Sequence, residues 1–162
     1  MRQVERAPAG VERGERLERL YREQGARMWR ALLAYAGDPE VASDAVAETF
    51  AQALRRGDAI RDPERWVWRT LFRVAAGELK ARARTFPLAV EGVYEMEAPA
   101  RELVAALGRL SEKQRAAVVL HHAAGYPVRE VAAILGSSPG AVKVHLLRGR
   151  RRLRELLGDG DA

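Results

Sequence analysis

Proline and glycine divide this chain into helix-length segments, and no other feature limits its fold as strongly. The triplet Asp-Pro-Glu occurs at 38–40 and again at 62–64. It combines an N-cap side chain, a proline suited to the first helical turn, and an acid that the helix dipole favours. Apolar residues follow each triplet at spacings of three and four, and no stretch shows sustained alternation of apolar and polar residues. The sequence therefore predicts an all-α fold.

The first half is predicted to hold three helices. The first begins near Leu17 and ends near Gly37, the second ends at Gly57, and the third runs from the second triplet towards Arg84. The N-terminus is rich in charge and lacks the apolar segment of a signal peptide, so we expect residues 1–14 to be a disordered extension.

The charge and the proline content of the chain change between residues 85 and 100. TFPLAVEGVYEMEAPA holds two prolines and three glutamates and has no lysine or arginine. The segments on both sides, 1–84 and 101–162, are net positive. We interpret 85–100 as an acidic linker between two small helical domains, 15–84 and 101–157, with a short tail at 158–162.

The second half ends in a predicted helix-turn-helix. A capping box at 111–114 starts one helix, a second helix stops at Gly136, and Ser138 with Pro139 can start the last one. Between residues 136 and 154 there are six basic side chains and no acid. In such units the second helix enters the major groove of DNA. The alternative is a helical hairpin with a solvated basic face. A membrane-surface helix is disfavoured, because the apolar residues opposite have the spacing of a domain core.

Composition limits the function further. The net charge of +6 and the isoelectric point near 10.3 favour a polyanionic partner. The absence of cysteine excludes disulfides and cysteine-based zinc sites. No grouping of histidines with carboxylates indicates a metal, and no nucleophile with a base indicates catalysis, so we expect no cofactor and no enzyme activity. Residues 116–124, the most apolar stretch, are too few to span a bilayer, and we expect a cytoplasmic protein without direct membrane contact.

Four stretches, taken in order, resemble the extracytoplasmic-function (ECF) sigma factors of bacterial RNA polymerase. They are GDPEVASDAVAETFAQAL (37–54), RDPERWVWRTLFR (61–73), LSEKQRAAVVL (110–120) and REVAAILGSSPGAVKVHLLRGRRRLREL (129–156). The resemblance covers nearly the whole chain. It implies that 15–84 is sigma domain 2, which binds core polymerase and recognises and melts the −10 element, and that 101–157 is sigma domain 4, which recognises the −35 element.

The resemblance also implies partners. These are core RNA polymerase, through the clamp helices of its largest subunit and the flap of its second-largest subunit, promoter DNA, and an anti-sigma factor. In the family the linker passes through the active-site cleft of the polymerase, and the acidic charge of 85–100 suits a path otherwise used by nucleic acid. A plain flexible tether is the alternative for this segment.

The resemblance assigns residues to three interfaces. The core-polymerase interface receives three carboxylates spaced by four and the amide that follows them: Glu40, Asp44, Glu48 and Gln52. The −10 DNA interface receives arginines for the backbone and rings for unstacked bases: Arg61, Arg65, Trp66, Trp68, Arg69, Phe72 and Arg73. The −35 DNA interface receives Ser138, Lys143, Val144, His145, Leu147, Arg148 and Arg150. Two tryptophans only two residues apart cannot both point the same way on a helix, so at least one should belong to the core.

Several positions depart from the usual family pattern, among them Ala47, Arg73 and Gly77. Two other functions stay open, and these three positions leave room for the first of them. One is a sigma-like mimic that sequesters an anti-sigma factor and does not support transcription. The other is a stand-alone helix-turn-helix repressor, which should bind duplex DNA tightly without polymerase.

Overall fold

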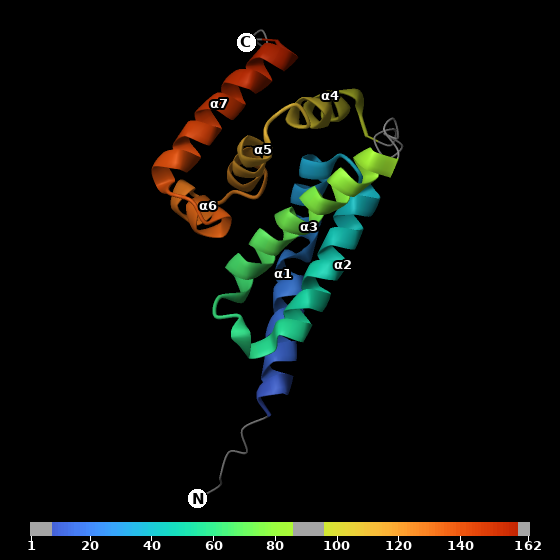
Figure 1. Ribbon diagram of the computed structural model, residues 1–162, viewed down its shortest axis with the longest axis vertical. Coiled ribbons are helices and arrows are strands. Elements are labelled where there is room, and N and C mark those ends of the chain that lie inside the picture. Colours follow the sequence, from blue (N-terminus) through green and yellow to red (C-terminus); the bar gives the residue numbers. More distant parts are fainter. Residues whose placement is uncertain (1–7, 86–95, 159–162) are drawn as a thin grey trace, which may run out of the picture.

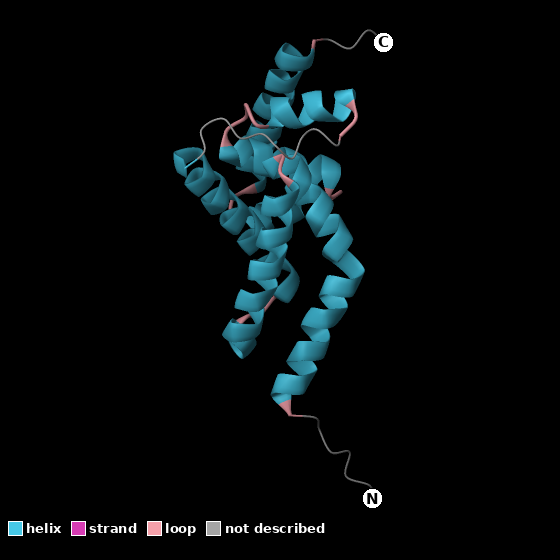
Figure 2. Cartoon of the chain, turned by 90° about the vertical axis from the view of Figure 1, so that its right-hand side faces the viewer, coloured by secondary structure: helices cyan, strands magenta, loops and turns pink. Residues whose placement is uncertain are grey.

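The structure is a computed structural model that describes residues 8–85 and 96–158, and all regular elements in these ranges are helical (Figure 2). The first half holds the helices α1 (Ala9–Ala36), α2 (Pro39–Arg56) and α3 (Pro63–Thr85), with the 3₁₀ turn η1 (Gly57–Ala59) after α2. The second half holds α4 (Ala98–Leu107), α5 (Glu112–Val118), the π-helical turn η3 (Val119–Ala123), α6 (Val128–Leu135) and α7 (Pro139–Leu157). The predicted all-α fold is confirmed.

The two helix starts predicted at the Asp-Pro-Glu triplets are present. Asp38 caps α2, its Oδ1 accepting from the amides of Glu40 (2.8 Å) and Val41 (3.3 Å), and Pro39 occupies the first turn. Asp62 likewise accepts from the amide of Arg65 (3.2 Å) at the start of α3. These bonds satisfy amides that have no partner inside the helix.

The helix-turn-helix boundaries also follow from local chemistry. Ser111 and Gln114 form the predicted capping box at the start of α5. Gly136 ends α6 in the left-handed region (φ +64°), which glycine adopts without strain. Ser138 then caps α7, its Oγ accepting from the amide of Ala141 (3.1 Å). The turn between α6 and α7 is therefore built as predicted.

Two boundaries differ from the expectation. Residues 9–14 were expected to be disordered and instead form the first turns of α1, where Arg13 Nε donates to Asp58 Oδ1 (3.0 Å) and ties the helix to η1. The expected linker is also shorter at its ends, because α3 continues to Thr85 and α4 already begins at Ala98. Residues 1–7, 86–95 and 159–162 lie outside the described residues, and with them most of the predicted acidic linker and the tail.

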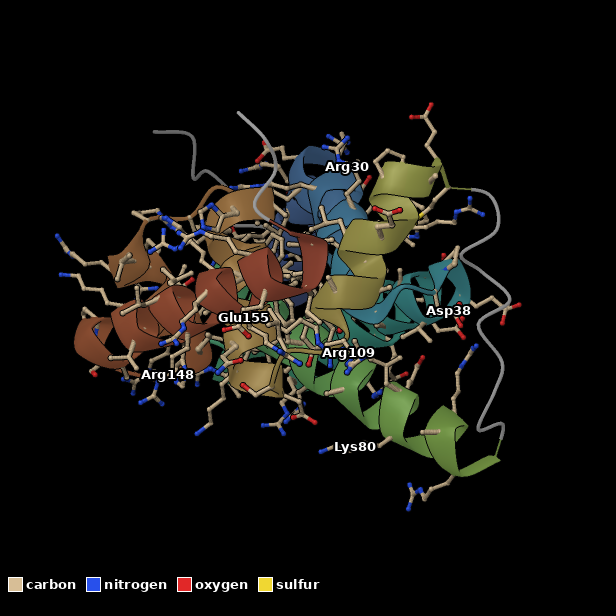
Figure 3. The ribbon with its side chains drawn as sticks, turned by 90° about the horizontal axis from the view of Figure 1, so that it is seen from above. Arg30, Asp38, Lys80, Arg109, Arg148 and Glu155 are labelled. Carbon is tan, nitrogen blue, oxygen red and sulfur yellow. The ribbon has the colours of Figure 1, made fainter. Side chains whose placement is uncertain are left out.

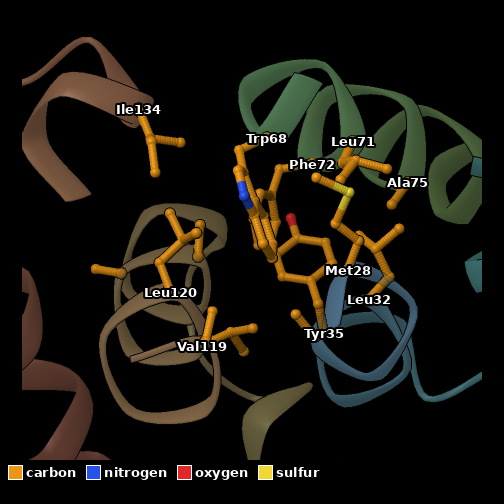
Figure 4. Close-up of a cluster of buried hydrophobic side chains, with 14 of the residues drawn as sticks. Met28, Leu32, Tyr35, Trp68, Leu71, Phe72, Ala75, Val119, Leu120 and Ile134 are labelled. Atoms are coloured by element: carbon orange, nitrogen blue, oxygen red, sulfur yellow. The ribbon is translucent and has the colours of Figure 1, made fainter. Parts of the chain in front are cut away.

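The helices α1, α2 and α3 form an elongated bundle, and the helices of the second half pack against its upper part (Figure 1). The buried side chains form one continuous core. Met28, Leu32 and Leu71 of the bundle are buried together with Leu120 and Ile134 of the second half (Figure 4). The two halves therefore share an apolar interface in this conformation.

Gly149 lets α7 lie close to α5. A β-carbon at this position would lie 2.9 Å from Val118 Cγ2, and Val118 is itself buried.

Overpacking of this kind lowers the free energy of unfolding by about 1–3 kcal/mol, whereas replacing a helical glycine by alanine raises it by up to about 1 kcal/mol. We expect Gly149→Ala to lower the free energy of unfolding by about 1 kcal/mol, measured by chemical denaturation. Gly140→Ala in the same helix is the control: its β-carbon meets nothing closer than 4.0 Å, so stability should not fall. Equal stabilisation by both variants would contradict close packing at Gly149.

Candidate functional site

The first candidate surface is the acidic face of α2, formed by Glu40, Asp44, Glu48 and Gln52. The three carboxylates are exposed, while the opposite side of the helix buries its apolar residues. Gln52 Nε2 donates to Glu48 Oε1 (2.8 Å), and Arg55 Nη2 lies 3.1 Å from the same oxygen. The hydrogen bond from Gln52 is the main reason that the pKa of Glu48 is lowered. The predicted alignment on one face is therefore present.

The helix α3 adds two side chains that the sequence analysis missed. Arg82 bridges Asp38 (2.8 Å) and Glu40 (3.3 Å), and so partly neutralises one end of the acidic face. Glu78, one turn earlier on α3, is half-buried near Asp44, Asp38 and Glu48. Desolvation by burial is the main cause of its raised pKa, and the negative charge of Asp44 raises the pKa further. Spacing of four between Glu78 and Arg82 indicates a shared helix face, but the sequence does not say that this face meets α2.

The raised pKa of Glu78 predicts a pH-dependent effect of Glu78→Gln. Below the ordinary glutamate pKa, the carboxyl is protonated in both the folded and the unfolded chain and carries no penalty. As pH rises, the folded state must hold a charge that burial desolvates and that the neighbouring carboxylates repel, so the penalty is complete at pH 7. We expect the substitution to raise Tm at pH 7 by about 1–3 °C, a small value because solvent screens the group, and to have less effect at pH 4. Glu102→Gln on α4 is the control, and an equal gain at both pH values would contradict the repulsion.

The second candidate surface is the arginine face of α3, formed by Arg61 in the loop before the helix and by Arg65, Arg69 and Arg73. All four side chains are exposed. Arg73 Nη2 donates to Gln52 Oε1 (3.2 Å), which joins this face to the acidic face of α2. Arg65 and Arg69 contact α6 of the second half. The predicted arginines are thus brought together, although Arg65, Arg69 and Arg73 already have partners inside the chain.

The aromatic part of the −10 prediction needs correction. Trp68 is 0% exposed and Phe72 is 5% exposed, because the two rings stack (centroids 6.3 Å apart) inside the shared core. Neither ring can meet a DNA base in this conformation, since the second half of the chain covers them. Trp66 is half-buried and keeps part of its surface open. Of the three predicted rings, Trp66 is the one within reach of an unstacked base.

The third candidate surface is the outer face of α7, formed by Ser138, Lys143, Val144, His145, Leu147, Arg148 and Arg150. Val142, Leu146 and Gly149 turn inward and are buried, which leaves this face outward. Val144 and Leu147 are 42% and 63% exposed, although they are apolar. His145 is half-buried beside the turn, and Ser138 holds the cap. Six of the seven predicted residues are thus exposed, and His145 is half-buried.

Two arginines of α7, Arg151 and Arg152, differ from the others. Arg151 Nε and Arg152 Nη1 both lie near carboxylate oxygens of Glu155, at 3.5 and 3.0 Å. Arg148 has no ion pair among the described residues, and it lies on the opposite side of the molecule from Asp38 of the acidic region (Figure 3). Lys143, Arg148, Arg150 and Arg154 form no ion pair within the described part of the chain, so the free cations of α7 extend to its last turn.

Other kinds of site find no support in the described ranges. Within residues 8–85 and 96–158 there is no group of three or more metal-ligating side chains. No helix in the same ranges combines the length and apolar character that a membrane crossing needs.

Comparisons with known proteins identify the family. The family profile Sigma-70, region 4 matches residues 100–153, from the first turn of α4 to near the end of α7. The ECF RNA polymerase sigma factor SigM of Mycobacterium tuberculosis is 31% identical over 151 residues, which cover 87% of this chain and 76% of SigM. The RNA polymerase sigma factor CarQ of Myxococcus xanthus is 44% identical over 59 residues, a match that covers 36% of this chain and 34% of CarQ.

A solved structure has the same fold. The sigma factor RpoE of Bartonella quintana, solved in complex with the anti-sigma factor NepR, superposes with a TM-score of 0.68 at 22% identity, covering 89% of this chain and 99% of RpoE. Identity at this level speaks for the fold alone. The match to SigM extends over most of both chains and therefore identifies the family as well as the fold. This chain belongs to the ECF sigma factors of RNA polymerase.

Proposed function

We propose that this chain binds core RNA polymerase through the acidic face of α2 and directs transcription from promoters with defined −10 and −35 elements. Residues 15–84 would act as sigma domain 2 on the clamp helices of the largest subunit. Residues 101–157 would act as sigma domain 4 on the flap of the second-largest subunit and on −35 DNA. Sigma factors are DNA-binding regulators rather than enzymes, which agrees with the expectation of no catalytic site.

The observation that carries this proposal is the exposed pair Val144 and Leu147 between the cations Lys143 and Arg148. Exposure of apolar side chains to water at the outer face of a helix is unfavourable. In the major groove they suit thymine methyl groups, while the neighbouring cations suit guanine edges or phosphates. The expectation of hydrophobic base contacts at the −35 element rests on this arrangement.

The −10 interface is proposed in a reduced form. Arg61, Arg65, Arg69 and Arg73 would hold the DNA backbone, and Trp66 would stack on an unpaired base. Trp68 and Phe72 would support α3 from the core. Arg65 and Arg69 must first leave their contacts with α6.

An anti-sigma factor is a further proposed partner. The structural neighbour RpoE was solved with an anti-sigma factor, and we transfer this kind of partner to the present chain as a proposal. We also propose that the chain acts in the cytoplasm, where RNA polymerase works.

The test is transcription with a reconstituted holoenzyme. Core RNA polymerase from the same organism is mixed with the chain and with a library of promoter fragments, and run-off transcripts are sequenced. We expect selection of a shared −10 and −35 pair, with no transcripts from core alone. Inactivity at all selected fragments, together with failure to co-purify with core, would favour the sigma-like mimic. Tight sequence-specific duplex binding by the free chain would favour the repressor, whereas we expect weak, salt-sensitive binding.

A further inference from the structure

The first turns of α1 lie beside η1, the turn that connects α2 to α3 (Figure 1). The side chains that α1 buries in the core begin at Leu17, so residues 9–16 bury none of their own. A helical segment that adds nothing to the core is held by its other contacts, and here these contacts are with η1. The turn η1 leads directly to Arg61, the first arginine of the proposed −10 interface.

Arg13 joins α1 to η1 by a two-point contact. Its Nε donates to Asp58 Oδ1 (3.0 Å), and its Nη2 lies 2.5 Å from Asp58 Oδ2. Two parallel contacts of this kind fix the orientation of both groups as well as their separation. The hydrogen bond from Arg13 is the main reason that the pKa of Asp58 is lowered, and the positive charge of Arg16 contributes to the same effect. Arg16 therefore lies near the same carboxylate.

Gly57 allows the guanidinium of Arg13 to approach the backbone of the turn. Gly57 has φ +59° and ψ −129°, a conformation that glycine alone adopts without strain. A β-carbon at this position would lie 2.9 Å from Arg13 Nη1. The turn buries no side chain of its own, and its closing hydrogen bond, from the Ile60 amide to the Gly57 carbonyl, spans 3.2 Å. The contact with Arg13 is therefore a major part of what holds η1 in place.

A small cavity lies between the first turns of α1, the turn η1 and the start of α3. Glu12, Arg13 and Arg16 line it from α1, and Asp58 and Ile60 line it from the opposite side. Its volume of about 180 Å³ is smaller than the sites that hold whole small-molecule ligands. Arg16 is exposed and takes part in no ion pair within residues 8–85 and 96–158. This cation is available to an external anion beside the loop.

The position of Arg61 depends on η1. Arg61 follows the last residue of η1 by two positions, and Asp62 next to it caps α3 through the amide of Arg65 (3.2 Å). The loop is thus fixed by the cap on one side and by η1 on the other, so a shift of η1 moves Arg61. Proteins that hold single-stranded DNA use positive charges that track its backbone. Arg16 on α1 and Arg61 after η1 provide such charges around one loop.

We propose that the first turns of α1 belong to the −10 DNA interface, with Arg13 as a positioning residue and Arg16 as a direct contact to a phosphate of the unpaired strand. Arg13 holds η1 and, through it, Arg61. This inference rests on the proposed −10 role of Arg61. It gives a function to residues 9–16, which form helix without contributing to the core.

The positioning role is tested first in the free chain, by hydrogen exchange of the backbone amides. Arg13→Gln removes the charge and one half of the two-point contact. We expect the amides of residues 57–61 to exchange about three- to fivefold faster, and those in the middle of α2 and α3 to stay unchanged. Arg22→Gln is the matched control, because it breaks the exposed ion pair with Glu18 (3.0 Å) on the same helix. Unchanged exchange at 57–61 in Arg13→Gln overturns the positioning role.

The second measurement is promoter opening by the reconstituted holoenzyme, followed with a fluorescent base analogue in the −10 element. Arg13→Gln should lower the opening equilibrium about twofold, because a smaller fraction of the chain holds Arg61 in place. When Arg61→Gln is already present, Arg13→Gln should have no further effect, since it acts through Arg61. A purely structural role would give the same factor in both backgrounds, and that result overturns the positioning role.

The direct contact is tested by the salt dependence of the same opening equilibrium. Arg16→Gln should lower opening for every −10 sequence and reduce the slope of its logarithm against log salt by about 0.7, as for one phosphate contact on a single strand. Arg30→Gln, further along α1, removes the same charge from an exposed position and should leave the slope unchanged. An equal reduction in both variants, or none in Arg16→Gln, overturns the contact.

Failure of this inference is distinguishable from failure of the proposed function. If the unmodified chain opens no promoter with core polymerase, the proposed function is wrong and this inference falls with it. If the unmodified chain opens promoters and neither Arg13→Gln nor Arg16→Gln differs from its control, only this inference is wrong.

Discussion

Reversal of the charge at Asp44 (Asp44→Arg) is expected to remove most of the affinity of the chain for core RNA polymerase. Asp44 lies at the centre of the acidic face of α2, one turn from Glu40 and one turn from Glu48. Those two neighbours already contact Arg82 and Arg55, whereas Asp44 takes part in no ion pair within the described part of the chain. It is therefore the carboxylate most available to a basic partner helix.

The expected loss is large because a like charge replaces an attractive one. Placing a cation against a basic surface costs several kcal/mol, so we expect a loss of about 100-fold or more in affinity. The fold should be preserved, since Asp44 is exposed while Val41 and Ala45 on the same helix hold the packing. The measurement is the equilibrium affinity of the labelled chain for core polymerase at two or more salt concentrations.

Glu23→Arg on α1 is the matched control, because it makes the same charge change on an exposed position outside the acidic face. Its affinity for core should stay within about threefold of the unmodified chain. If Asp44→Arg also stayed within that range, the acidic face of α2 would not be the polymerase interface.

Helix boundaries could be predicted from the sequence because their causes are local. Asp38, Ser111 and Ser138 each cap a helix by bonds to amides two or three residues away, and Gly136 closes α6 by its own backbone freedom. These interactions depend on neighbours that the sequence displays directly. For the same reason the alignment of Glu40, Asp44 and Glu48 on one face was predicted correctly.

The packing of the two halves could not be predicted in this way. Arg69 meets the carbonyl of Ile134, 65 positions later, and Tyr126 meets Glu64, 62 positions earlier. Nothing in the local pattern around Trp68 distinguishes a ring that binds DNA from one that α6 and η3 cover. The position of Glu78 beside Asp44 likewise depends on how α2 and α3 are aligned, which helical periodicity leaves open.

Replacement of Lys143 and Arg148 by alanine is expected to change promoter choice, whereas replacement of Arg151 and Arg152 should only weaken binding. The first pair is exposed on the outer face of α7, on either side of the apolar Val144 and Leu147. A contact to a base edge contributes about 1–3 kcal/mol of discrimination, so losing the first pair should reduce selection of the preferred −35 sequence about 10- to 100-fold.

Arg151 and Arg152 both contact Glu155, whose carboxylate partly neutralises their positive charge. Their loss should lower affinity by a similar factor for every −35 sequence and reduce its salt dependence, as expected for phosphate contacts. Both double variants remove two positive charges from exposed positions of the same helix, so each is the charge-matched control for the other. The measurement is competitive run-off transcription by the holoenzyme on a library of −35 variants. Equal and sequence-independent losses from both pairs would mean that α7 only holds the DNA backbone.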